Sequence, residues 1–86
     1  MYRVVLTKRA SKGFGKAPEH VQERVGEVME ALQQTFAPVK LFDVKKLKGL
    51  EDTFRIRIGG WRIIYELHRK ESVVVLDITP RGGAYS

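Results

Sequence analysis

Apolar residues follow two different periods along the chain, and the change between them separates the elements. Tyr2, Val4 and Leu6 share one face of a strand over residues 2–6. Between residues 18 and 36 the apolar positions recur at the i, i+4, i+7 spacing of a helix, with glutamate and glutamine between them. From residue 53 onward, strand-like runs return. The pattern predicts a strand, then helices, then further strands.

Two helices are expected in the first half of the chain. Thr7 can cap a short helix over residues 8–16, although two glycines weaken it. Pro18 is well placed to open a second helix, and Pro38 is expected to end it. The apolar face of this second helix is formed by Val21, Val25, Val28, Leu32 and Phe36.

Three strand-like runs follow a lysine-containing connector over residues 39–52. They span residues 53–58, 61–68 and 72–79, and Gly59-Gly60 between the first two marks a tight hairpin because both positions tolerate positive φ. We therefore expect a single α+β domain over residues 1–86, with element order β-α-α-β-β-β. Its four-stranded antiparallel sheet would carry both N-terminal helices packed on one face.

Pairing across Gly59-Gly60 sets a register that separates apolar from basic side chains. It places Arg57 directly opposite Arg62, and the alternation of side chains puts Arg55 on the same face. The apolar partners then share the other face, under the helices.

The next hairpin extends this register through an expected turn at residues 69–72. The predicted pairs are His68 with Val73, Leu67 with Val74, Tyr65 with Leu76, Ile63 with Ile78, and Arg62 with Thr79. Arg81 then falls beside Arg62 on the helix-free face, next to Pro80, which interrupts strand pairing. The apolar residues expected on this outer face form either an ordinary sheet surface or a groove for an apolar helix of a partner: Ile64, Val73 and Val75.

Charge gives the first functional clue. The chain carries 16 Lys and Arg against 10 Asp and Glu, a net charge of +6, with a sequence pI near 9.9. Net charge alone leaves an ordinary basic protein as an equal alternative. However, like charges directly opposite one another oppose folding, and such local conflict tends to mark function. Arginines converging from three strands therefore indicate a surface that binds a polyanion.

Other residue types exclude several kinds of site. The chain has no cysteine, which excludes thiol catalysis and thiolate metal sites. Its histidines, His20 and His68, are far apart in sequence, so we expect no metal and no cofactor. The apolar runs are too short for a membrane span or a secretory signal. A cytoplasmic protein is expected.

Arginine suits one part of RNA cleavage and not another. Its planar fork binds phosphate through two donors and keeps its charge, which also makes it a poor general base. No histidine falls in the cluster by this register. Tyr85 is the phenol nearest to Arg81 in sequence, and it either stacks on a base or assists proton transfer, or is simply an aromatic residue near the terminus.

Four segments together resemble RelE toxins of the RelE/ParE superfamily, and the resemblance covers essentially the whole chain. The central strand–Gly–aromatic–Arg pattern is shared across the superfamily, whereas the ending with Arg81 and Tyr85 is similar to the catalytic tail of ribosome-dependent mRNA endonucleases. The segments are Lys46-Leu47-Lys48-Gly49, Thr53-Phe54-Arg55-Ile56-Arg57-Ile58, Gly60-Trp61-Arg62-Ile63-Ile64-Tyr65 and Pro80-Arg81-Gly82-Gly83-Ala84-Tyr85.

The resemblance implies the toxin of a type II toxin–antitoxin system. Such toxins bind in the ribosomal A site and cleave the exposed mRNA by 2′-hydroxyl attack without metal, which inhibits translation. They leave a 2′,3′-cyclic phosphate and a 5′-hydroxyl. A RelB-type antitoxin wraps and neutralises them.

The resemblance also implies roles for individual residues. Arg62 stabilises the transition-state phosphate, Arg81 contacts the phosphate and assists the leaving oxygen, and Tyr85 stacks on the mRNA base. Arg55 and Arg57 replace two lysines of related toxins. If a lysine normally serves as general base, arginine cannot readily take over that role.

The lysines of the connector offer one answer to this departure. Either Lys46 or Lys48 reaches into the site, or the reaction relies on positioning and electrostatics. Solvent exposure or phosphate contacts with RNA are the simpler roles for Lys45, Lys46 and Lys48.

Two alternatives to the nuclease stay open. One is a ParE-like inhibitor of DNA gyrase without catalytic chemistry, for which Arg81 and Tyr85 beside the Arg57–Arg62 pair have no evident use. The other is a member that has lost catalysis and retains only nucleic-acid or antitoxin binding.

Overall fold

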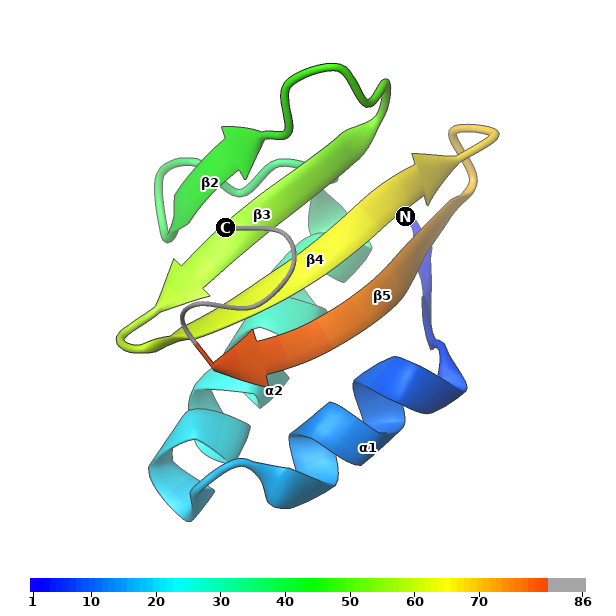
Figure 1. Ribbon diagram of the computed structural model, residues 1–86. Coiled ribbons are helices and arrows are strands. Elements are labelled where there is room, and N and C mark those ends of the chain that lie inside the picture. Colours follow the sequence, from blue (N-terminus) through cyan, green and yellow to red (C-terminus); the bar gives the residue numbers. More distant parts are fainter. Residues whose placement is uncertain (81–86) are drawn as a thin grey trace.

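The computed structural model describes residues 1–80, in which two helices cover one face of a five-stranded sheet (Figure 1). The elements are β1 (Arg3–Leu6), α1 (Lys8–Lys16), α2 (Glu19–Gln34), β2 (Asp43–Lys46), β3 (Thr53–Ile58), β4 (Trp61–His68) and β5 (Ser72–Pro80). The strand order is β1-β5-β4-β3-β2. β1 runs parallel to β5, and the other neighbouring strands are antiparallel.

The α+β class and the two helices on one face are confirmed, but the expected four antiparallel strands are wrong. β2 lies inside the segment predicted as a connector, where a single apolar residue, Val44, gives too little alternation to reveal a four-residue edge strand. β1 is parallel because the two helices carry the chain across the sheet, and the β3–β4–β5 meander ends beside β1 running in its direction.

The first helix agrees with its prediction and the second ends earlier than expected. Thr7 caps α1, and its hydroxyl oxygen accepts from the Ala10 N–H at 3.1 Å. Pro18 precedes α2 as its N-cap residue. The backbone is already extended at Thr35, so α2 ends before Pro38 and Phe36 lies outside the helix.

The helices bury their apolar faces against the strands. Val25, Val28 and Leu32 of α2 are fully or almost fully buried, as are Ile56 and Ile63 of the sheet. Burying a side chain of this size contributes about 1.5–3 kcal/mol, so this layer fixes which face of the sheet is covered.

A β-bulge in β5 corrects the register predicted for the second hairpin. His68 pairs with Ser72 rather than Val73, and Tyr65 pairs with Val75 rather than Leu76. The turn therefore spans residues 69–71, one residue shorter than expected, and the irregularity at Ile64/Tyr65 leaves Leu76 as the extra residue. Beyond the bulge the predicted pairs Ile63 with Ile78 and Arg62 with Thr79 are confirmed.

The bulge changes the role of the apolar residues expected on the outer face. Val73 and Val75 are completely buried within the core cluster, so their predicted outer placement is wrong. Ile64 does lie on the helix-free side, opposite Arg55 and Asp77, but it too is completely buried. The proposed exposed groove for a partner helix is therefore not present on these residues.

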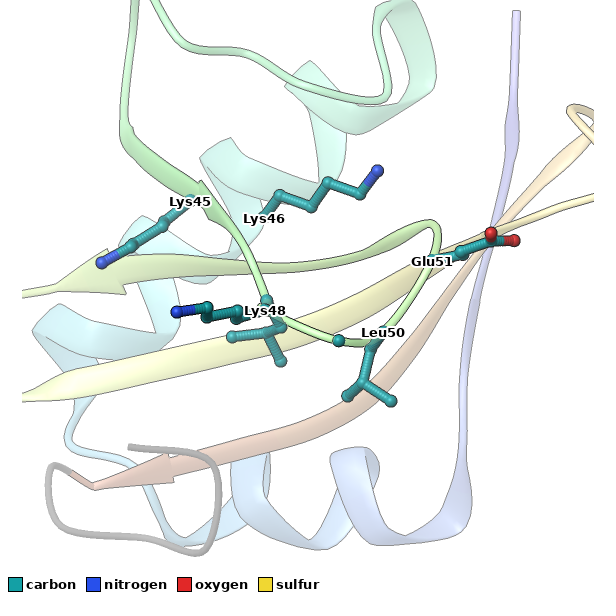
Figure 2. A pocket seen from close by; sticks show the side chains of 7 residues that line it. Lys45, Lys46, Lys48, Leu50 and Glu51 are labelled. Carbon is teal, nitrogen blue, oxygen red and sulfur yellow. The ribbon is translucent and has the colours of Figure 1, made fainter.

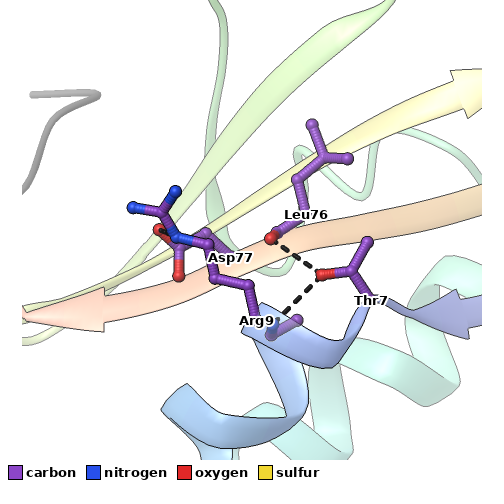
Figure 3. Close-up of polar contacts among 5 residues, drawn as sticks. Thr7, Arg9, Leu76 and Asp77 are labelled. Atoms are coloured by element: carbon purple, nitrogen blue, oxygen red, sulfur yellow. Dashed lines mark hydrogen bonds and ion pairs between the residues drawn. The ribbon is translucent and has the colours of Figure 1, made fainter.

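The start of α1 holds the bulge in place (Figure 3). The Thr7 hydroxyl donates to the Leu76 carbonyl at 2.9 Å, and the Thr7 N–H donates to the Val75 carbonyl at 3.0 Å. One residue further along the strand, Asp77 forms an ion pair with Arg9 of α1, with Nε and Oδ2 3.1 Å apart. These contacts join the end of β1, the first turn of α1 and the bulged part of β5.

An aromatic cluster fixes the segment after α2. Tyr65 is fully buried, stacks on Phe54 at 5.4 Å between ring centroids, and donates its hydroxyl hydrogen to the Phe36 carbonyl at 2.8 Å. The Phe36 ring contacts Phe54 at 5.7 Å and Tyr2 at 6.3 Å between centroids. Burial raises the pKa of the Tyr65 phenol well above its ordinary value.

Gly13 allows α1 to lie directly on β5, which gives the first prediction. A Cβ atom at Gly13 would overlap the Ile78 carbonyl oxygen, whereas one at Gly15 would meet no atom within 4 Å. Gly13→Ala should lower the free energy of unfolding by about 2 kcal/mol, because the helix must move off the strand. Gly15→Ala, the matched control in the same helix, should raise it by about 0.5–1 kcal/mol. Urea denaturation measures both, and equal effects would contradict the close packing.

The Tyr65 hydroxyl gives the second prediction. Tyr65→Phe should lower the free energy of unfolding at pH 7 by about 1 kcal/mol, because the Phe36 carbonyl loses its donor. The folded protein keeps the phenol proton at a pH where the unfolded chain releases it, so this residue's contribution declines above about pH 10. Urea denaturation at pH 7 and pH 10.5 should show the difference between wild type and variant narrowing. A difference that widens would contradict the assignment.

Candidate functional site

Three arginines from adjacent strands lie on the side of the sheet that the helices leave uncovered, here termed the arginine face. Arg57 of β3 is directly opposite Arg62 of β4, and Arg55 is opposite Ile64, as the hairpin register predicts. The core partners Ile56 and Ile63 alternate with them and point toward the helices. The same residues that build the core therefore also place the arginines.

The arginines differ in burial and in charge pairing. The Arg55 side chain is only 9% exposed, with Nη1 3.6 Å from Oδ2 of Asp43. The Arg57 side chain is 49% exposed, with Nε 4.0 Å from the same oxygen. Arg62 is partly exposed. Arg55 thus ties the edge strand β2 to β3, while Arg57 and Arg62 are the more accessible members of the cluster.

Asp43 and Asp77 are two of the carboxylates on the arginine face, and neither was identified from the sequence. Asp43 lies opposite Arg57 on β2, the strand that was expected to be a connector. Asp77 is opposite Ile64 and is only 5% exposed, held by Arg9. A strand prediction for residues 43–46 would have revealed Asp43, because the alternation then sets Asp43 and Lys45 on the face away from Val44.

The connector lysines do not act as one group. Lys45 is opposite Arg55 and so belongs to the arginine face, whereas Lys46 is opposite Phe54 and starts from the other side of β2. Figure 2 shows Lys45 and Lys48 extending in one direction and Lys46 in the opposite one. Residues 45–51 surround a surface hollow of about 620 Å³. Lys45 and Lys48 extend the positive surface, and Lys46 is set apart from it.

Two members of the predicted site, Arg81 and Tyr85, lie outside the described residues, and their positions beside Arg62 stay predictions. Within residues 1–80, no three His, Asp or Glu side chains are grouped as a metal site would require. In the same part of the chain, neither helix has the length and apolar content needed to cross a membrane.

Comparison with known proteins identifies the family to which this chain is similar. Residues 4–85 match the model of a family described as the ParE toxin of the type II toxin–antitoxin system parDE. A relative described as "Putative toxin RelE1", from Methanocaldococcus jannaschii, is 31% identical over 85 residues, which is 98% of this chain and 94% of the relative.

Several solved structures of toxin–antitoxin complexes contain chains similar to this one. The RelE–RelB complex of Pyrococcus horikoshii OT3 contains a chain with 34% identity and a TM-score of 0.83, covering 96% of this chain and 98% of the other. The toxin–antitoxin complex RelBE2 of Mycobacterium tuberculosis gives 28% identity and a TM-score of 0.72, with coverages of 93% and 98%. The E. coli RelBE complex, at 20% identity and a TM-score of 0.80, covering 96% and 100%, supports the fold alone. The resemblance expected from the sequence is confirmed: the chain belongs to the RelE-type toxins of the RelE/ParE toxin–antitoxin superfamily.

Proposed function

We propose that this toxin is an endoribonuclease that cleaves mRNA in the ribosomal A site, and that a RelB-like antitoxin neutralises it. The observation that carries the proposal is the directly opposed pair Arg57 and Arg62 on the helix-free face. A similar chain from Pyrococcus horikoshii is part of a RelE–RelB complex, which supports the choice of antitoxin. The toxin would act in the cytoplasm, where ribosomes translate.

The opposed arginines suit the stabilisation of a phosphate under attack. Side chains directly opposite one another in a sheet have Cβ atoms about 5 Å apart, so two guanidinium groups can approach one phosphate together. Each presents several N–H donors and keeps its charge. When a 2′-hydroxyl attacks the adjacent phosphorus, extra negative charge develops on the phosphate oxygens, and Arg57 and Arg62 would stabilise it. This chemistry requires no metal ion.

The remaining predicted residues would have supporting roles. Arg55 would orient the cluster from its buried position beside Asp43. Lys45 and Lys48 would bind RNA phosphates around the site, whereas Lys46, which starts from the other side of β2, would contact only phosphates farther from it. In the same proposal Arg81 assists the leaving 5′-oxygen and Tyr85 stacks on the mRNA base, as the family resemblance implies.

A second candidate function follows from the family model that matches, which is described as the ParE toxin. A ParE-like protein would inhibit DNA gyrase by binding it, without cleaving nucleic acid. A member that has lost catalysis but still binds its antitoxin is a third candidate. The nuclease would break mRNA, whereas the gyrase inhibitor would block DNA supercoiling.

The third prediction tests the nuclease directly. Purified toxin added to a cell-free translation reaction should break mRNA at discrete positions only while ribosomes translate, as mapped by primer extension. Arg62→Ala should reduce the cleavage rate about 100-fold or more, because one stabilising donor group is lost from the transition state. Arg81→Ala should have a similar effect.

Arg24→Ala is the matched control, since Arg24 is a half-exposed arginine on α2, which packs on the opposite side of the sheet, and is paired with Glu27. It should leave cleavage within about twofold of wild type, and circular dichroism should show all three variants folded. Intact mRNA together with blocked supercoiling by gyrase would select the ParE-like function. Cleavage by Arg62→Ala at the wild-type rate would show that the arginine face is not the active site.

A further inference from the structure

The proposed reaction lacks a proton acceptor among its arginines. The attacking 2′-hydroxyl must lose its proton, and guanidinium groups stay protonated, so Arg55, Arg57 and Arg62 cannot accept it. The histidines lie elsewhere: His20 is on α2, and His68 is six residues from Arg62 on β4, about 20 Å along the strand. A group other than these arginines and histidines must accept the proton.

Within residues 1–80, the strands of the arginine face carry three carboxylates, which differ in position and in existing contacts. Asp77 is nearly buried and is already paired with Arg9 at 3.1 Å. Glu66 is four residues from Arg62 along β4, about 13 Å away. Asp43 is directly opposite Arg57, which in turn is directly opposite Arg62, so these three residues form one row across β2, β3 and β4.

The contacts of Asp43 leave its carboxylate able to accept a hydrogen bond from a substrate. Its Oδ2 atom is 3.6 Å from Nη1 of Arg55 and 4.0 Å from Nε of Arg57, both longer than a hydrogen bond. The side chain is 57% exposed, so a substrate hydroxyl can reach it. The charged groups that face it are Arg55 and Arg57 of β3, Arg62 in the same row on β4, and Lys45 on its own strand.

We propose that Asp43 is the general base of the cleavage reaction, an inference that rests on the proposed nuclease function. A carboxylate oxygen of Asp43 accepts the proton of the 2′-hydroxyl while O2′ forms a bond to phosphorus. The bond between phosphorus and O5′ breaks, leaving a 2′,3′-cyclic phosphate. The departing 5′-oxygen takes a proton from water, and the hydroxide so formed removes the proton from Asp43.

The rival base is the neutral amine of Lys45 or Lys48, and the pH dependence of the cleavage rate separates it from a carboxylate base. A carboxylate base is ionised throughout pH 6–9, whereas an amine must lose a proton that it ordinarily holds up to about pH 10. The single-turnover cleavage rate of wild-type toxin on ribosomes programmed with one A-site codon should therefore be nearly flat from pH 6.5 to 9. A rate that rises tenfold per pH unit would overturn the proposal in favour of lysine.

Substitution of Asp43 gives the fourth prediction. In the same single-turnover assay, Asp43→Asn should reduce the rate at pH 7 about 100-fold or more. The residual rate should rise with pH, because hydroxide replaces the lost base. Asp43→Glu should recover much of the activity by restoring a carboxylate. Glu66→Gln, a carboxylate on the same face outside the row, should cleave like wild type.

Other results would count against the assignment. If Asp43→Asn cleaves within about threefold of wild type, Asp43 is not the base. If its rate falls but keeps a flat pH profile, Asp43 only positions the arginines, and the proposal is overturned. Thermal unfolding of both Asp43 variants checks that they are folded. A folded wild-type toxin that leaves ribosome-bound mRNA intact would overturn the nuclease function, and the base with it.

Discussion

Side chains of successive strand residues point to opposite faces of a sheet, and in this protein that alternation determines the core and the arginine face together. In β3, Ile56 enters the core while Arg55 and Arg57 on either side of it point away. A slip of one residue would turn the isoleucine away from the core and place both arginines under the helices. Burial of apolar surface under the helices therefore maintains the arginine register, even though the direct opposition of Arg57 and Arg62 is itself unfavourable for folding.

In β5, the core residues stay on the helix-covered face along the whole strand only because of the bulge. Val75 and Ile78 are three residues apart, an odd spacing that would send them to opposite faces in a regular strand, yet both belong to the core. The extra residue, Leu76, restores the alternation, and Thr7 stabilises the bulge by donating hydrogen bonds to the carbonyl groups of Val75 and Leu76. The N-terminal strand and helix thus support the register of β5 through to its pairing with Arg62.

Local signals in the sequence were sufficient to predict the two helices, the Gly59-Gly60 hairpin and the three arginines on the helix-free face. They were insufficient for β2, whose identity depends on hydrogen bonds to β3 rather than on its own pattern, and Asp43 was missed for that reason. The parallel pairing of β1 with β5 depends on where the helices return the chain to the sheet. The spacing of apolar residues within either strand does not reveal this. The odd spacing of the core residues Val75 and Ile78 is the one local sign of the bulge, and a regular ladder cannot accommodate it.

The chemistry proposed for this toxin requires an RNA phosphate to bind between Arg57 and Arg62, with Asp43 beside the attacking hydroxyl. The most direct measurement is a cryo-electron microscopy structure of the toxin bound to a ribosome whose A-site codon carries 2′-O-methyl groups, which block the attack and trap the complex. We expect the phosphate that follows the modified nucleotide within hydrogen-bond distance of both guanidinium groups. An mRNA backbone that passes over the helices, or over the hollow around residues 45–51 without approaching either arginine, would contradict the account.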